Sequence, residues 1–101
     1  MNLEEAMAMA PKMTDNEVLV AKPPLTWGSE AMFVELTDDY GLPPEFNREA
    51  SWEPLLGKAE IDDLLAFLKT KAVSKRTMAE LIVHYAVMDC APAWAHDLRD
   101  A

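Results

Sequence analysis

A chain of 101 residues with half of its side chains apolar and 27% charged is expected to fold as one globular domain over residues 1–101. Its net charge of −9 argues against nucleic-acid and membrane-surface binding, because phosphates and anionic lipids would be repelled. One cysteine excludes an intramolecular disulfide, and the acidic N-terminus lacks the basic start of a signal peptide, so we expect a cytoplasmic protein.

The first half of the chain predicts one short helix followed by two strands. Residues 3–10 carry apolar side chains at helical spacing, and Asn2 is placed to cap that helix. Two strands are predicted at residues 16–22 and 31–37, because both stretches are rich in β-formers. The link between them is longer than a tight hairpin loop, so we expect antiparallel pairing with its register left open. One face of the second strand would carry its alternate apolar side chains, Met32, Val34 and Leu36.

The second half of the chain predicts an edge strand and two helices. Residues 51–56 suit a short edge strand, because Pro54 has no N–H to donate to a central ladder. Residues 58–72 predict a helix whose apolar side chains form one stripe along its surface. Residues 77–90 are apolar almost all round, so we expect them to form the central helix, ended by Pro92. The predicted fold class is α+β, with a small antiparallel sheet of two to three strands packed against about three helices.

The segment HYAVMDCAPAW, residues 84–94, raises the question of a catalytic or metal site. On a helix, Asp89 lies about 140° and Cys90 about 240° around the axis from His84, so the three side chains cannot converge. The only other histidine is His96, and its spacing from Cys90 matches no zinc-ligand pair. We therefore predict the end of a structural helix here, and no metal site.

No other pattern in the chain predicts catalysis. The sequence contains no GxGxxG, P-loop or GxSxG motif. The pair Asp62-Asp63 is explained by the first turn of a helix, and the pair Asp38-Asp39 by a turn before Gly41. We therefore predict a protein that is not an enzyme and that needs no cofactor.

Acidity concentrated in the first half of the chain predicts a docking surface. Residues 1–57 hold eleven acidic and three basic side chains, whereas residues 58–101 hold seven and six. Trp27 and Trp52 lie beside prolines in the acidic half, and we expect both to be partly exposed as interface anchors. The acids would steer a basic protein partner, and the aromatic rings would supply the binding energy. The predicted docking residues are Trp27, Glu30, Asp38, Asp39, Tyr40, Trp52 and Glu53.

Three alternatives remain open from the residues alone. The acidic side chains would also be explained if they only keep a small domain soluble and bind no partner. Tryptophans beside acids would also suit a pocket for a small cationic or amphiphilic ligand. A homodimer is compatible with either function, because a thin sheet with an exposed edge can pair with a second copy.

The order of four stretches resembles that of small acidic bacterial proteins of unknown function: EVLVAKPPLTW, AMFVEL, LLGKAEIDDLLAFL and ELIVHYAVMDCAPAW. Proteins of that group are associated with toxin immunity or with mobile gene cassettes of the integron type. The resemblance implies an accessory protein of the immunity or adaptor type. The chain departs from the group's pattern at His84-Tyr85 and at Cys90-Ala91-Pro92, so no residue's role is carried over.

Overall fold

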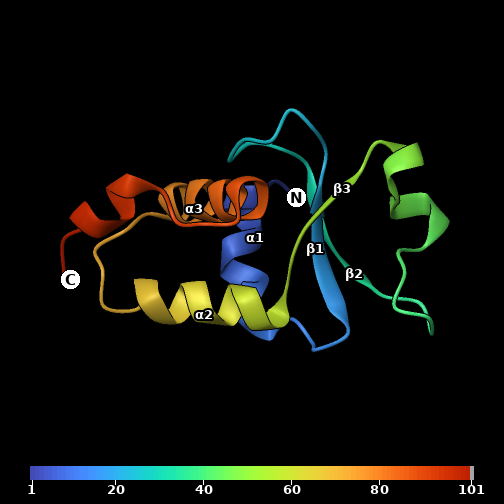
Figure 1. Ribbon diagram of the computed structural model, residues 1–101, viewed down its shortest axis with the longest axis horizontal. Coiled ribbons are helices and arrows are strands. Elements are labelled where there is room, and N and C mark those ends of the chain that lie inside the picture. Colours follow the sequence, from blue (N-terminus) through green and yellow to red (C-terminus); the bar gives the residue numbers. More distant parts are fainter. Residues whose placement is uncertain (101) are drawn as a thin grey trace.

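The computed structural model describes residues 1–100 as a three-stranded antiparallel sheet with three α-helices packed on one side (Figure 1). The predicted α+β fold class is confirmed. The helices and strands are α1 (Leu3–Met9), β1 (Glu17–Ala21), β2 (Ala31–Glu35), β3 (Glu53–Gly57), α2 (Lys58–Leu68) and α3 (Lys75–Met88). Short 3-10 turns cover Ala10–Lys12, Pro44–Phe46, Arg48–Ala50 and Ala93–Asp97.

α1 forms where its sequence predicts a helix, because a complete capping box starts it. The Asn2 side chain accepts a hydrogen bond from the Glu5 N–H (2.8 Å), and the Glu5 carboxylate accepts one from the Asn2 N–H (3.0 Å). The first turn of α1 also holds the β1–β2 connection, since the Glu4 N–H donates to the Trp27 carbonyl (3.0 Å). The capped helix start thus positions Trp27.

β1 is the central strand in the order β2-β1-β3 and pairs antiparallel with both neighbours. Leu19 of β1 lies opposite Phe33 of β2 and Leu56 of β3. The β1–β3 register shifts between Leu19 and Val20, and Val20 then meets Pro54. Pro54 therefore lies in an edge strand, as its missing N–H predicts.

β2 is the other edge strand, and the start of the chain covers part of it. The Ala31 N–H donates to the Met1 carbonyl (2.8 Å), and Asn2 forms an antiparallel bridge with Glu30. Only the part of the edge beyond Ala31 is left for pairing with another chain. A homodimer formed through this edge stays a prediction.

Apolar side chains cover both faces of the sheet, but unequally. Leu19 and Leu56 belong to a cluster of sixteen buried residues, to which all three α-helices contribute. Among the described residues, the opposite face carries a cluster of three buried side chains, covered by residues 42–50 at the right of Figure 1. Its members are Val20, Val34 and Trp52. We call this group the small core, and it makes the structure a sheet with one thick and one thin covering layer.

α3 is less buried than its sequence predicts. The Ser74 side chain caps it by accepting a hydrogen bond from the Thr77 N–H (3.1 Å). Val87 and Met88 are each 60% exposed, so one flank of this helix, which is apolar almost all round, is not covered. The physical reason is that the packing of α3 against α1, α2 and β3 does not reach that flank. Its fully covered residues are Ala79, Leu81 and Ile82.

α2 ends at Leu68, four residues before its predicted end. The residues that follow pair instead with the C-terminal segment. The Ala72 N–H donates to the Arg99 carbonyl (2.8 Å), and the Lys71 ammonium forms an ion pair with Asp100 (2.8 Å). Tertiary hydrogen bonds therefore replace the last predicted turn of this helix.

The longest helix among residues 1–100 is α3, with 14 residues. It stops at Met88, because Asp89 adopts a left-handed backbone conformation (φ 58°) before Pro92 is reached. None of the helices in the described part of the chain has the length and apolar content needed to cross a bilayer.

Candidate functional site

The structure does not bring the seven predicted docking residues together on one surface. Asp38, Asp39 and Tyr40 form an exposed turn that follows β2 at one end of the sheet. Glu30 and Glu53 lie at the opposite end, about 13 Å away along the five-residue strands. Trp27 lies on the helical side, and Trp52 lies on the other side of the sheet.

Trp52 is buried, and the prediction that it is a partly exposed anchor is wrong. Its side chain is 6% exposed and meets the Phe46 ring edge to face, with centroids 5.5 Å apart. The Lys22 ammonium lies 5.0 Å from the centroid of the same indole. The indole is buried because residues 42–50 fold back over the sheet, so Trp52 is a structural residue of the small core.

Trp27 is partly exposed, as predicted, and is held between two helices. The Arg76 guanidinium of α3 lies over its indole, 3.7 Å from the ring centroid. The Arg76 Nε in turn lies 3.8 Å from the Glu4 carboxylate of α1. These contacts fix the tryptophan at the rim of a groove rather than leaving it free in solvent.

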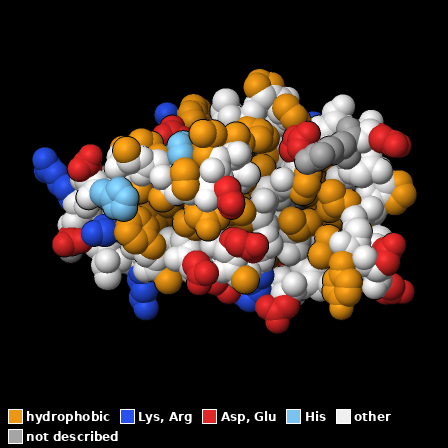
Figure 2. Space-filling model, viewed as in Figure 1, with side chains coloured by type: hydrophobic (Ala, Val, Ile, Leu, Met, Phe, Trp, Pro, Cys, Tyr) orange, Lys and Arg blue, Asp and Glu red, His pale blue; other side chains and the backbone are white. Residues whose placement is uncertain are grey.

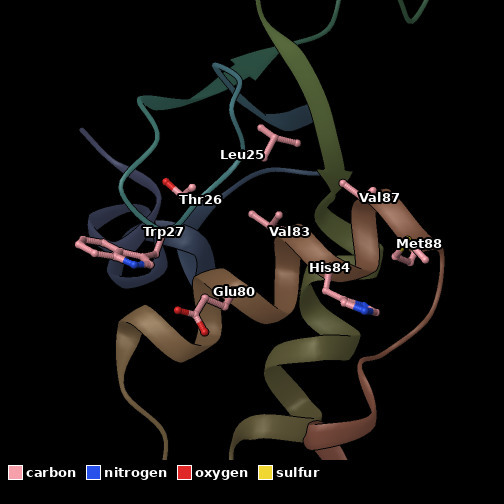
Figure 3. A pocket seen from close by; sticks show the side chains of 8 residues that line it. All are labelled: Leu25, Thr26, Trp27, Glu80, Val83, His84, Val87 and Met88. Atoms are coloured by element: carbon pink, nitrogen blue, oxygen red, sulfur yellow. The ribbon is translucent and has the colours of Figure 1, made fainter.

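The groove has a volume of about 520 Å³ and lies between residues 25–27 and the outer flank of α3. The α3 wall is one helical stripe, because its residues follow the spacing i, i+3, i+4, i+7 and i+8. That wall consists of Glu80, Val83, His84, Val87 and Met88. Figure 3 shows Leu25, Thr26 and Trp27 lying across from this stripe. We call this site the α3 groove.

The loop wall of the α3 groove is held by hydrogen bonds within the loop itself. The buried Ser29 hydroxyl donates to the Pro24 carbonyl (2.7 Å) and accepts a hydrogen bond from the Thr26 N–H (2.8 Å). The Thr26 hydroxyl accepts a further one from the Gly28 N–H (3.2 Å). An apolar wall that is ordered in advance lowers the entropic cost of binding.

Two titratable side chains lie on the α3 stripe, Glu80 and His84. The His84 Nδ1 lies 3.0 Å from the Cys90 carbonyl oxygen, which can only accept a hydrogen bond. Nδ1 is therefore the donor, and Nε2 of the neutral ring remains an acceptor. This hydrogen bond ties the turn after α3 back to the helix through the backbone of Cys90 and does not involve the thiol.

The α3 groove combines apolar walls with one carboxylate. Its walls are mainly apolar, and Glu80 adds a negative charge to the α3 wall. Within residues 1–100, no three His, Cys, Asp or Glu side chains are grouped so that they could hold a metal ion. Figure 2 shows hydrophobic side chains across the middle of one face, with carboxylates along its lower edge and right-hand end.

Most of the groove residues were missed from the sequence. The alignment of Glu80, His84 and Met88 on one helix face was recognisable, because they are four residues apart. Val83 and Val87 make this helix apolar almost all round, and such a pattern predicts a central helix rather than the wall of a groove. Leu25 carried no sequence signal, because its position beside α3 depends on how the β1–β2 connection folds.

Comparison with family models, with curated proteins and with solved structures gave no match. The resemblance to immunity and cassette proteins therefore stays a prediction. The geometry of the α3 groove, its exposed apolar stripe and the acidity of the chain are the observations from which a function can be inferred.

Proposed function

We propose that this protein is a non-enzymatic binding protein, of the immunity or adaptor type, that docks a basic amphipathic helix of a partner protein in the α3 groove. The observation that carries the proposal is the exposed apolar stripe around Val87 and Met88, each 60% exposed. Contiguous exposed apolar side chains beside an ordered wall are typical of protein interaction sites.

The dimensions of the α3 groove favour a helical partner. The stripe from Glu80 to Met88 extends about 12 Å along the axis of α3. A partner helix presents apolar residues i, i+4 and i+7 over a similar length, which is the usual pattern of helix-in-groove recognition. Val83 and Val87 would contact these side chains from one wall, and Leu25 would contact them from the other.

The charge of the molecule favours a basic partner. Residues 15–57, which form the sheet and the segment over its outer face, contain nine acidic and two basic side chains. Glu80 adds a carboxylate within the groove itself. The acids would raise the association rate of a cationic helix, and the apolar stripe would set its dissociation rate.

A small cationic or amphiphilic ligand is the second candidate, because the groove volume of about 520 Å³ is of the usual size for small-molecule sites. The Arg76 guanidinium already lies over the Trp27 ring at 3.7 Å, however. That face of the indole is therefore not free to form a cation–π contact with a ligand. This observation favours the protein helix over the small cation.

The test uses a fluorescently labelled amphipathic helical peptide with lysines on its polar face, and a second peptide with glutamates in their place. We expect the lysine peptide to bind, and Val87→Lys to weaken binding about tenfold or more, because it removes apolar contact and adds like charge. Met32→Lys is the matched control, since Met32 is also an exposed apolar residue but lies on β2.

The proposal is wrong if Val87→Lys and Met32→Lys change the dissociation constant equally. It is equally wrong if the glutamate peptide binds as tightly as the lysine peptide. Binding of the lysine peptide should also weaken as ionic strength rises, because the long-range attraction is screened.

A further inference from the structure

A second groove lies where the three α-helices meet, on a part of the molecule that the α3 groove does not include. Its volume is about 550 Å³. Its most buried lining residue is Met7 of α1, and the half-buried Leu65 of α2 and Met78 of α3 lie beside it. We call this site the helix-seam groove. Two methionines among its lining residues make it adaptable to flexible apolar ligands, because thioether side chains repack readily.

The charged lining of the helix-seam groove is cationic, in contrast to the rest of this acidic molecule. Lys69, at the end of α2, and Lys75, at the start of α3, are exposed and line it. Neither lysine forms an ion pair with any described side chain. Among the described lining residues, Asp62 alone carries a carboxylate, and it is already paired with Lys58 at 3.1 Å. Two ammonium groups without an ion-pair partner among the described side chains therefore adjoin an apolar floor.

The two lysines lie at helix ends of opposite polarity. Lys75 is the first residue of the 14-residue helix α3, whose N-terminal end carries the positive pole of the helix dipole, whereas Lys69 is the C-cap of α2 and lies at its negative pole. Residues 58–101 hold six basic and seven acidic side chains, so this half of the chain does not share the strong negative charge of the other half. An anionic group is thus attracted here, although the whole molecule has a charge of −9.

We propose that the helix-seam groove binds a free single-chain anionic amphiphile of the fatty-acid class. The ammonium groups of Lys69 and Lys75 would hold the carboxylate, since flexible lysine side chains can converge on one anion. The alkyl chain would lie against Met7, Leu65 and Met78. The volume of about 550 Å³ lies within the usual range for sites that take small ligands.

The distribution of methionines allows a test that locates the ligand. Met7 and Met78 line the helix-seam groove, Met88 lines the α3 groove, and Met32 lies on β2. With ¹³C-methyl methionine in the full chain, dodecanoate added below its micelle concentration should shift the Met7 and Met78 methyl signals saturably. The Met88 and Met32 signals should not shift.

The variants test the role of the two lysines. We expect Lys69→Gln with Lys75→Gln to weaken dodecanoate binding about tenfold or more, because two charge-assisted contacts are lost. The control is Lys22→Gln with Arg99→Gln, which changes the net charge equally at residues that do not line the groove. Dodecyltrimethylammonium, with the same chain and a cationic head, should not shift Met7 and Met78.

The proposal is overturned if dodecanoate shifts Met88 rather than Met7 and Met78, or shifts none of them. It is also overturned if both double variants weaken binding equally, because bulk charge would then explain the effect. Equal binding of the cationic amphiphile at Met7 and Met78 would remove the role of the lysines. These outcomes are independent of the helical partner proposed for the α3 groove, which Met88 reports separately.

Discussion

Trp27 and Trp52 occupy similar sequence contexts but have different environments. Trp27 follows the pair Pro23-Pro24, Trp52 precedes Pro54, and neither tryptophan lies in a periodic apolar stripe. In the structure Trp52 fills the small core, whereas Trp27 stands at the rim of the α3 groove under Arg76. The difference arises because residues 42–50 cover one indole and no segment covers the other completely.

Trp52→Ala should lower the free energy of unfolding by about 3 kcal/mol or more, because it empties the centre of the small core. Tyr40→Ala is the control, since Tyr40 is 80% exposed and its change should stay within about 0.5 kcal/mol. Urea unfolding followed by circular dichroism measures both. A loss below about 1 kcal/mol for Trp52→Ala would contradict the buried position.

The carboxylate of Asp39 is held in its charged form by the turn in which it lies. The Thr37 hydroxyl donates a hydrogen bond to it, and the backbone N–H groups of Asp39 and Gly41 act in the same direction. These hydrogen bonds lower the pKa of Asp39 from its ordinary value of 3.8. A lowered pKa in the folded state stabilises the protein above pH 3.8, and this contribution is lost as the pH falls through the lowered value.

Thr37→Val should raise the pKa of Asp39 toward its ordinary value, because the first and largest cause of the shift is removed. Thr37→Ser retains the hydroxyl and should keep the pKa low. A carboxyl-detected NMR titration of the folded protein measures the pKa in each variant. An unchanged Asp39 pKa in Thr37→Val would show that the backbone N–H groups alone set it.

At the scale of the elements, the end of α3 illustrates how one residue limits a helix. Its apolar pattern continues to Cys90, yet the helix stops at Met88 because Asp89 takes a left-handed conformation with φ of 58°. The Asp89 N–H still donates to the Tyr85 carbonyl (2.8 Å), which completes the last turn. The His84–Cys90 hydrogen bond then directs the chain away from the helix.

Asp89→Gly should raise the free energy of unfolding by about 0.5 to 1 kcal/mol, because glycine adopts positive φ without strain. It also removes a negative charge from the negative end of the helix dipole. Asp89→Asn removes only the charge and should give a smaller gain. Thermal unfolding of the three proteins measures the effect, and destabilisation by Asp89→Gly would contradict the left-handed cap.

At the scale of the whole molecule, the two coverings of the sheet differ in strength. Within the part of the chain that the structure describes, the helical side has sixteen buried residues in its cluster, whereas the small core has three. A covering layer with little buried apolar surface opens at a lower free energy than the rest of the fold. We therefore expect residues 42–52 to open as a local unit while β1 stays paired.

Native-state hydrogen exchange should detect this local opening. The amide protons of Phe46, Ala50 and Trp52, each bonded within the 43–52 segment, should exchange at least about tenfold faster than that of Leu19. Their exchange should also depend less on denaturant, because a small opening exposes little surface. Equal protection and equal denaturant dependence would show that both layers unfold together.

Local rules predicted much of the fold but little of the candidate site. Asn2 caps α1 as the sequence predicts, because a cap requires only residues three positions apart. Pro54 lies in an edge strand for an equally local reason. The seven predicted docking residues were grouped by composition, which contains no information on distance, and the structure separates them.

The sequence by itself determined the α+β class, the order of the elements and most of their boundaries, because caps, alternation and proline act within a few residues of one another. Only the tertiary structure decided which apolar side chains stay accessible. Trp52 is covered and Val87 is not, because burial depends on which distant segment packs against each residue. Both proposed binding sites lie between elements that only tertiary packing brings into contact, because no local sequence pattern specifies that contact.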